Sequence, residues 1–155
     1  MKSICHRTCD KRHTRKDKQM IQPIEEMRAE DLDGQTILMR VDFNCPLAHG
    51  KVSDATRIDR IMPGIQALLE KGAAIILLSH LGRPKGKIVP EMSLAPICSY
   101  IEENYQLSVP LITQLDRLES PAAGTLVMAE NLRFSSEEEA NDERFAAKLA
   151  SAGDI

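Results

Sequence analysis

The spacing of apolar residues changes between strand-like and helix-like patterns along the chain. Residues 36–41 (TILMRV) are apolar and rich in β-branched side chains, which predicts a strand. Residues 54–71 carry apolar side chains at helical spacing, with Pro63 expected to kink the helix and Gly72 to end it. Residues 73–78 form an uninterrupted apolar run, typical of a strand covered on both faces.

One further helix and two further strands are predicted before the chain becomes more polar. Residues 42–53 and 79–90 are rich in breakers and are predicted as loops. Residues 93–105 repeat the helical spacing, and residues 125–129 have the apolar pattern of a strand. Residues 109–112 favour a short strand between them.

The last part of the chain combines an acidic stretch with one more helix. Residues 135–140 are predicted as a loop or a single helical turn, and the three glutamates at 137–139 as a solvated acidic face. Asn141 is predicted to cap a helix over residues 142–152. The order of strands and helices is typical of a doubly wound, Rossmann-like α/β domain with a parallel sheet.

Composition is that of an ordinary globular protein. The chain has 155 residues, of which 43% are hydrophobic and 28% charged, enough for one domain with a sizeable core. No apolar run approaches the ~20 residues that span a bilayer, so no membrane association is expected. Aromatic residues make up 3% and Trp is absent, which argues against a base-stacking surface for nucleic acid.

The N-terminal segment differs from the rest in charge. Residues 1–19 hold seven Lys or Arg against two Asp, a net charge of +5, without apolar periodicity, and are predicted as a disordered basic extension. Met20 is an alternative natural start. Residues 20–155 then form the domain. The Cys5 and Cys9 pair with its two neighbouring histidines is too cramped for a zinc site, and the cysteine spacing indicates no disulfide framework, which favours a reducing cytoplasm.

Polar residues follow each confident strand. Asp42 and Asn44 follow the first, His80 and Arg83 the second, and Arg133 the third. The carboxyl ends of parallel strands meet at one edge of a sheet, where ligands bind in such folds. Guanidinium groups there suit phosphate and carboxylate oxygens.

Each of these residues alone has an ordinary structural interpretation. A single arginine is usually a solvated surface charge, and a single histidine more often has a structural hydrogen bond than a catalytic role. Their joint placement, with Arg57 at the start of the first helix, favours an anion site. The glycines form neither a dinucleotide fingerprint nor a Walker loop, so no triphosphate cradle is predicted. Cys45 and Cys98 are interpreted as packing residues.

Four segments together resemble phosphoglycerate kinase. They are residues 40–47 (RVDFNCPL), 56–58 (TRI), 78–84 (LSHLGRP) and 130–134 (ENLRF), in the order and spacing of that family. The resemblance covers residues 20–155. It implies the incomplete N-terminal lobe of a two-lobe glycolytic kinase that transfers a phosphoryl group between 1,3-bisphosphoglycerate and ADP, giving 3-phosphoglycerate and ATP.

The resemblance also assigns roles to individual residues. It implies that Arg57 is catalytic and reaches the transferring phosphoryl group. The implied substrate-binding residues are Asp42, Phe43, Asn44, Arg57, His80, Leu81, Gly82, Arg83 and Arg133. It implies no metal ligand in this chain, Mg-ATP or Mg-ADP as nucleotide in the full-length family without a site for it here, and a cytoplasmic monomer.

The departures from the family leave alternatives open. Cys45 stands where the family usually has Val, and the extension before Met20 is not typical. The nucleotide-binding lobe is not in this sequence, so we expect the 155-residue polypeptide alone to fold poorly and to lack kinase activity. A non-catalytic module that binds 3-phosphoglycerate, an inactive remnant, and a split enzyme completed by a second chain remain as alternatives.

Overall fold

The computed structural model describes residues 27–155. The predicted disordered extension at residues 1–19 and the region of Cys5 and Cys9 lie outside these described residues. The helices and strands are α1 (Ala29–Leu32), β1 (Thr36–Arg40), β2 (Leu47–Ala48), β3 (Lys51–Val52), α2 (Thr56–Glu70), β4 (Ala74–Leu78), α3 (Ala95–Tyr105), β5 (Leu111–Ile112), β6 (Leu126–Ala129), α4 (Ser136–Glu139) and α5 (Glu143–Ala150). Short 3₁₀ helices are η2 (Pro90–Met92), η3 (Leu115–Arg117) and η4 (Leu132–Phe134).

A four-stranded parallel sheet forms the centre of the domain. Its strand order is β1-β4-β6-β5, and every neighbouring pair is parallel. Leu77 of the central strand β4 pairs with Met39 of β1 on one side and with Met128 of β6 on the other. The carboxyl ends of β1, β4 and β6 therefore lie side by side at one edge of the sheet.

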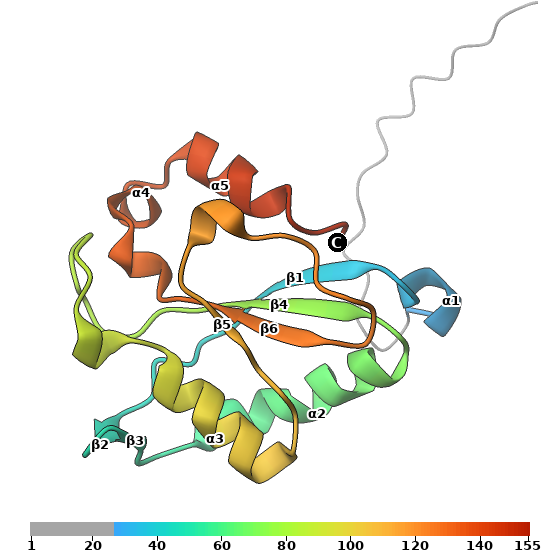
Figure 1. Ribbon diagram of the computed structural model, residues 1–155, viewed down its shortest axis with the longest axis horizontal. Helices are drawn as coiled ribbons and strands as arrows, with labels where there is room; N and C mark the ends of the chain where they lie inside the picture. Colours follow the sequence, from blue (N-terminus) through green and yellow to red (C-terminus); the bar gives the residue numbers. More distant parts are fainter. Residues whose placement is uncertain (1–26) are drawn as a thin grey trace, which may run out of the picture.

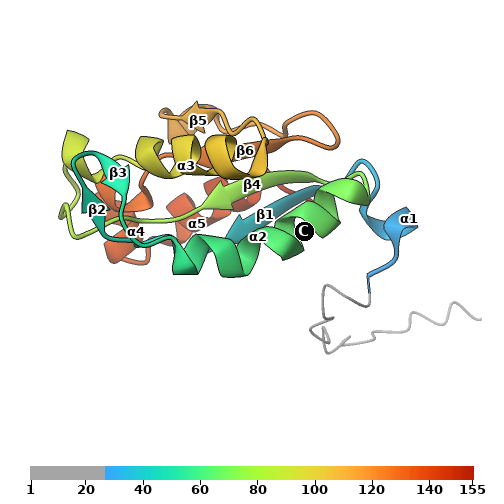
Figure 2. The same ribbon diagram turned by 90° about the horizontal axis from the view of Figure 1, so that it is seen from below.

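Helices cover both faces of this sheet (Figures 1 and 2). Ile75 and Leu77 of β4 belong to the core under α2 and α3, whereas Ile76 and Leu78 belong to the core under α5. Successive side chains of a strand point to opposite faces, so a strand buried on both sides must be apolar throughout. The predicted doubly wound α/β fold is confirmed, and the uninterrupted apolar run that predicted β4 has this cause.

The edge of β1 that faces away from β4 is paired with the last two residues of the chain. The N–H of Ile155 donates to the carbonyl of Thr36 at 3.2 Å, and its carbonyl accepts from Leu38 N–H at 2.8 Å. This is the hydrogen-bond pattern of a parallel ladder. The carboxylate of Asp154 also accepts from Thr36 N–H at 2.9 Å.

The structure differs from the sequence-based expectations in three places. Helix α1 and the β2–β3 hairpin were not predicted, because pairs of two-residue strands carry no readable alternation. Helix α2 continues through Pro63, as the predicted helix over residues 54–71 implies, and Pro63 lies on its exposed side. The prediction that Asn141 caps the last helix is wrong: Asp142 accepts from Phe145 N–H at 2.8 Å, while Asn141 has the left-handed φ of 52° that ends the preceding turn.

Within residues 27–155, no helix combines the length and the apolar character that crossing a membrane requires.

Candidate functional site

Three loops meet at the carboxyl edge of the sheet, and the first two are joined by Asn44. The side-chain oxygen of Asn44 accepts from Gly82 N–H at 3.0 Å, which links the loop after β1 to the loop after β4. Its own N–H donates to Asp42 at 3.1 Å, and the other oxygen of Asp42 is paired with the guanidinium of Arg57. Asp42 thus connects the start of helix α2 to the strand edge. Side chains of Asp42 and Arg57 remain more than half exposed, so both are open to a ligand.

The buried Ser79 also joins the loop after β4 to the loop after β1. The hydroxyl of Ser79 donates to the carbonyl of Val41 at 2.9 Å and accepts from Phe43 N–H at 3.1 Å. The side chains of Phe43 and Leu81, both predicted site residues, are buried in the core. Successive side chains of an extended segment point to opposite sides, so Asp42 and Asn44, the polar neighbours of Phe43, lie at the surface. Phe43 and Leu81 can therefore contact a ligand only through their backbone.

Asn131 joins the loop after β6 to the loop after β4, and sequence reasoning did not single it out. It is fully buried, and its amide nitrogen donates to the carbonyls of Leu81 and Met92, each at 2.8 Å. Its side-chain oxygen accepts from Arg133 N–H at 3.1 Å. The neighbouring Glu130 accepts from the N–H of Leu94 at 2.9 Å, at the start of α3. The motif ENLRF would have flagged both residues only through the family resemblance.

Arg133 lies where these loops converge. Its Nη1 donates to the carbonyl of Gly82 at 3.0 Å, and its Nε lies 3.6 Å from Oε2 of Glu138 on α4. Nε is buried and has no hydrogen-bond partner among the described residues. The other oxygen of Glu138 is 2.5 Å from Nη2 of Arg40, at the end of β1.

The interpretation of residues 137–139 as a solvated acidic face is therefore wrong for one of them. The side chain of Glu138 is only 11% exposed, whereas Glu137 and Glu139 are exposed. A one-turn helix turns the middle glutamate toward the arginines and its two neighbours outward. Three consecutive identical residues gave no signal of which one points inward.

His80 is half-buried among these charges. Burial lowers its pKa below the ordinary value, and the positive charge of Arg133 lowers it further, while Asp42 and Glu138 oppose the shift. The imidazole is therefore neutral at neutral pH, with the proton-bound form destabilised by its surroundings. An anion bound nearby would favour the protonated form.

The three predicted arginines at the carboxyl edge of the sheet differ in how many neighbouring groups hold their side chains. Arg133 is held by neighbouring groups, Arg57 is paired with Asp42, and Arg83 is exposed without a hydrogen bond or ion pair to any of residues 27–155. Within the same range, no group of three or more His, Cys, Asp or Glu is placed to hold a metal ion. The arrangement can bind an anion on an open surface at the carboxyl ends of β1, β4 and β6.

The two described cysteines belong to the packing, as predicted. Cys45 and Cys98 are both buried and free. Burial raises the pKa of the Cys98 thiol to about 12 and also raises that of Cys45. Neither supplies a thiolate at neutral pH.

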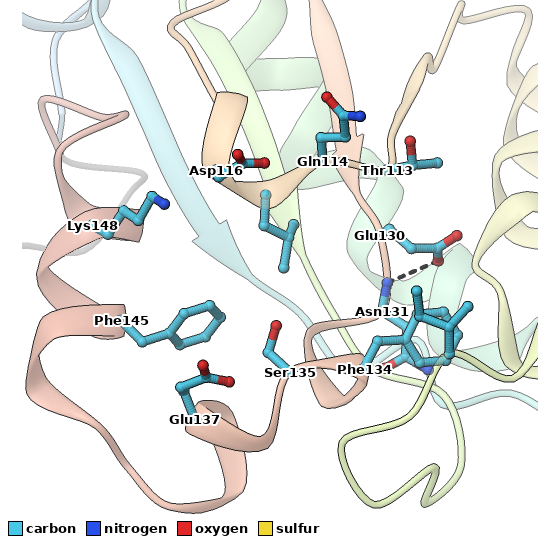
Figure 3. A pocket seen from close by; sticks show the side chains of 12 residues that line it. Thr113, Gln114, Asp116, Glu130, Asn131, Phe134, Ser135, Glu137, Phe145 and Lys148 are labelled. Atoms are coloured by element: carbon cyan, nitrogen blue, oxygen red, sulfur yellow. Dashed lines mark hydrogen bonds between the residues drawn. The ribbon is translucent and has the colours of Figure 1, made fainter.

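A separate pocket of about 500 Å³ lies among η3, η4, α4 and α5 (Figure 3). Lys148 and Phe145 of α5 line one side, and Glu130 and Phe134 line the other. None of the predicted site residues lines it. The candidate anion site is therefore a surface formed by loops and not this cavity.

Comparison with known proteins agrees with the motifs. The sequence model of the family described as Phosphoglycerate kinase matches residues 27–155. The chain belongs to the phosphoglycerate kinase family. The phosphoglycerate kinase of Dinoroseobacter shibae is 50% identical over 126 residues, which cover 80% of this chain and 32% of the relative. That of Synechococcus elongatus is 45% identical over 138 residues, covering 83% of this chain and 34% of the relative.

Solved structures of this family have the same fold. Phosphoglycerate kinase from Coxiella burnetii superposes with a TM-score of 0.75 at 35% identity, covering 80% of this chain and 32% of that one. The enzyme from Pyrococcus horikoshii gives a TM-score of 0.67 at 25% identity and covers 79% of this chain. The chain spans about a third of the length of the curated relatives it matches.

Proposed function

We propose that residues 27–155 form the acid-substrate-binding part of a phosphoglycerate kinase. The reaction of the whole enzyme transfers a phosphoryl group between 1,3-bisphosphoglycerate and ADP to give 3-phosphoglycerate and ATP. One observation carries the proposal: the strand order β1-β4-β6 brings the loops with Asp42, His80, Arg83 and Arg133 to one edge of the sheet. Hydrogen bonds from the side chains of Asn44, Asn131 and Arg133 to the backbone of the loop after β4 hold these loops together.

The residues divide into binding and catalytic groups. Asp42, Asn44, His80, Arg83 and Arg133 bind the phosphorylated acid, with Phe43, Leu81 and Gly82 contributing through their backbone. Arginine forks match carboxylate and phosphate oxygens bidentately, and an exposed Arg83 is free to do so. Arg57 is the catalytic residue; support comes from its place in the first turn of α2, from its pairing with Asp42 and from its exposed side chain.

The chemistry explains why the site contains no strong general base. The acceptor in the direction of ATP use is a carboxylate, which is already ionised and needs no deprotonation. Rate acceleration then depends on alignment and on neutralising the charge of the phosphoryl oxygens. The pairing of Arg57 with Asp42 supports the proposal that its guanidinium supplies that neutralisation.

The nucleotide belongs to the remaining two thirds of the family's length. Members of the family use ADP and ATP with magnesium, and we assign no step of this chain's residues to them. We further propose that the protein acts as a cytoplasmic glycolytic enzyme and as a monomer.

Isothermal titration calorimetry with 3-phosphoglycerate tests the proposal, on preparations of the 155-residue chain that circular dichroism shows to be folded. We expect saturable binding that Arg83→Gln weakens by about tenfold, since a charge-assisted hydrogen bond contributes roughly 1.5–3 kcal/mol and 1.4 kcal/mol is tenfold. Arg28→Gln, which removes the same charge beside α1 at the opposite edge of the sheet, should leave the affinity within about twofold. Absence of binding by a chain that circular dichroism shows to be folded would refute the proposal, as would equal losses in the two variants.

A further inference from the structure

One carboxylate lies inside a group of cations that the proposed function uses to bind an anion. Glu138 approaches Arg40 with one oxygen, at 2.5 Å, and Arg133 with the other, at 3.6 Å. Its side chain is 11% exposed, compared with 56% for Arg40 and 26% for Arg133. A carboxylate that is nearly buried is retained only where positive partners compensate its lost hydration.

The contacts of Arg133 restrict its guanidinium in two places. Nη1 is held by the carbonyl of Gly82, and Nε faces Glu138. A guanidinium is planar, so fixing the surroundings of two of its nitrogens fixes the direction of the third. Nη2 of Arg133 is then the group left to meet an incoming anion.

Without Glu138, two of these cations would lack their shared counter-charge. Arg40 ends strand β1 and Arg133 belongs to η4, so different elements bring them to the same carboxylate. Their mutual repulsion would favour rotamers that move the two charges apart. The short contact with Arg40 fixes the position of the Glu138 carboxylate, and the guanidinium of Arg133 lies beside that carboxylate.

We propose that Glu138 is a positioning residue of the anion site, which holds the guanidinium of Arg133 in the orientation that meets the phosphorylated acid. This inference rests on the proposed function. The opposite role, a carboxylate that merely repels the incoming anion, predicts tighter binding when its charge is removed. The two roles therefore differ in the sign of the effect.

The test combines affinity for 3-phosphoglycerate with the behaviour of Arg133 itself. We expect Glu138→Gln to weaken binding at least about fivefold, although it removes a negative charge from an anion site. Glu138→Asp, which keeps the charge but withdraws it by one methylene, should weaken binding as well. Glu139→Gln, an exposed neighbour with the same change of charge, should leave the affinity unchanged.

A double-mutant cycle separates positioning from a general loss of structure. If Glu138 acts through Arg133, the effect of Glu138→Gln disappears in an Arg133→Gln background and persists in an Arg83→Gln background. Equal effects in both backgrounds, or unchanged or tighter binding by Glu138→Gln, would overturn the inference. Thermal melts identify an unfolded variant, in which case Glu138→Asp replaces the glutamine variant in the cycle.

A measurement without ligand keeps this inference distinct from the proposed function. In ¹⁵N relaxation of arginine side chains, the Nε–H of Arg133 should be ordered in the wild type and mobile in Glu138→Gln, with the signal of Arg83 unchanged. Ordered Arg133 in both proteins overturns the positioning role. Failure of the wild type to bind 3-phosphoglycerate overturns the proposed function and the ligand named in this inference, whereas the ordering of Arg133 by Glu138 is decided by the relaxation data.

Discussion

Replacing Asn131 with alanine would remove the amide that joins the loop after β6 to the loop after β4. The fully buried side chain donates to the carbonyls of Leu81 and Met92 at 2.8 Å and accepts from Arg133 N–H at 3.1 Å. All three backbone partners lie in segments that carry or adjoin the anion site. The substitution leaves these three backbone groups without their hydrogen-bond partner and changes no side chain that the proposal assigns to the ligand.

The magnitude follows from the number of stranded groups. A buried polar group left without a partner costs about 1–3 kcal/mol, so three of them set an upper range of about 3–9 kcal/mol. Met92 O and the arginine N–H are only partly buried, and water entering the vacated volume satisfies part of the demand. We expect Asn131→Ala to lower the free energy of unfolding by about 3–5 kcal/mol, a large share of the ~5–15 kcal/mol of a typical domain.

Urea unfolding followed by far-UV circular dichroism measures this loss. Asn104→Ala is the matched control, because Asn104 also donates a side-chain amide to a carbonyl, that of Tyr100 at 2.8 Å, but on an exposed helix end. We expect that variant to lie within about 0.5 kcal/mol of the wild type. A cost for Asn131→Ala within about 1 kcal/mol of the control would refute the account of how the loops are held together.

Two further predictions concern the loop after β4. Gly86 has φ 70°, and an added Cβ would lie 2.9 Å from Cβ of Ser136, whereas Gly124 has φ 72° and open space around it. In urea unfolding, Gly86→Ala should therefore lower the free energy of unfolding by about 1–3 kcal/mol more than Gly124→Ala. Equal losses in the two variants would contradict this. Burial lowers the pKa of His80, so the unfolded chain binds a proton first as pH falls below about 6.5. The free energy of unfolding should therefore decline from that pH down to the lowered folded-state pKa, and His80→Gln should flatten this part of the profile; identical profiles would exclude the contribution.

The sequence predicted those strands and helices whose own apolar pattern shows how they are buried. The apolar run from residue 74 to residue 78 indicates β4 because both of its faces are covered, and the arginines follow the strands in the chain itself. Parallel pairing then brings Arg83 and Arg133 to one edge. The strand order was not predicted, but the carboxyl ends of all strands of a parallel sheet lie at one edge whatever their order, so the location of the site could be inferred.

The parts that sequence missed depend on contacts between distant residues. Asn131 bonds to the carbonyl of Leu81, 50 positions away, and no local spacing reports a side chain bonded to a remote backbone group. Glu138 was indistinguishable from its two identical neighbours until the turn of α4 set its direction. Asn141 and Asp142 are both good caps, and only the backbone conformation decided between them.

The hydrogen bonds among the three loops also bear on where the domain can change length. Asn44, Asn131 and Arg133 each reach across to the backbone of the loop after β4, so an added residue in any one loop would displace the other two. The turn at Gly124, at the amino end of β6, has no such side-chain ties to the site and has open space around its glycine. We therefore expect an inserted residue or tag to be tolerated in the turn at Gly124, whereas a change of length in any of the three loops at the carboxyl edge should disturb all three.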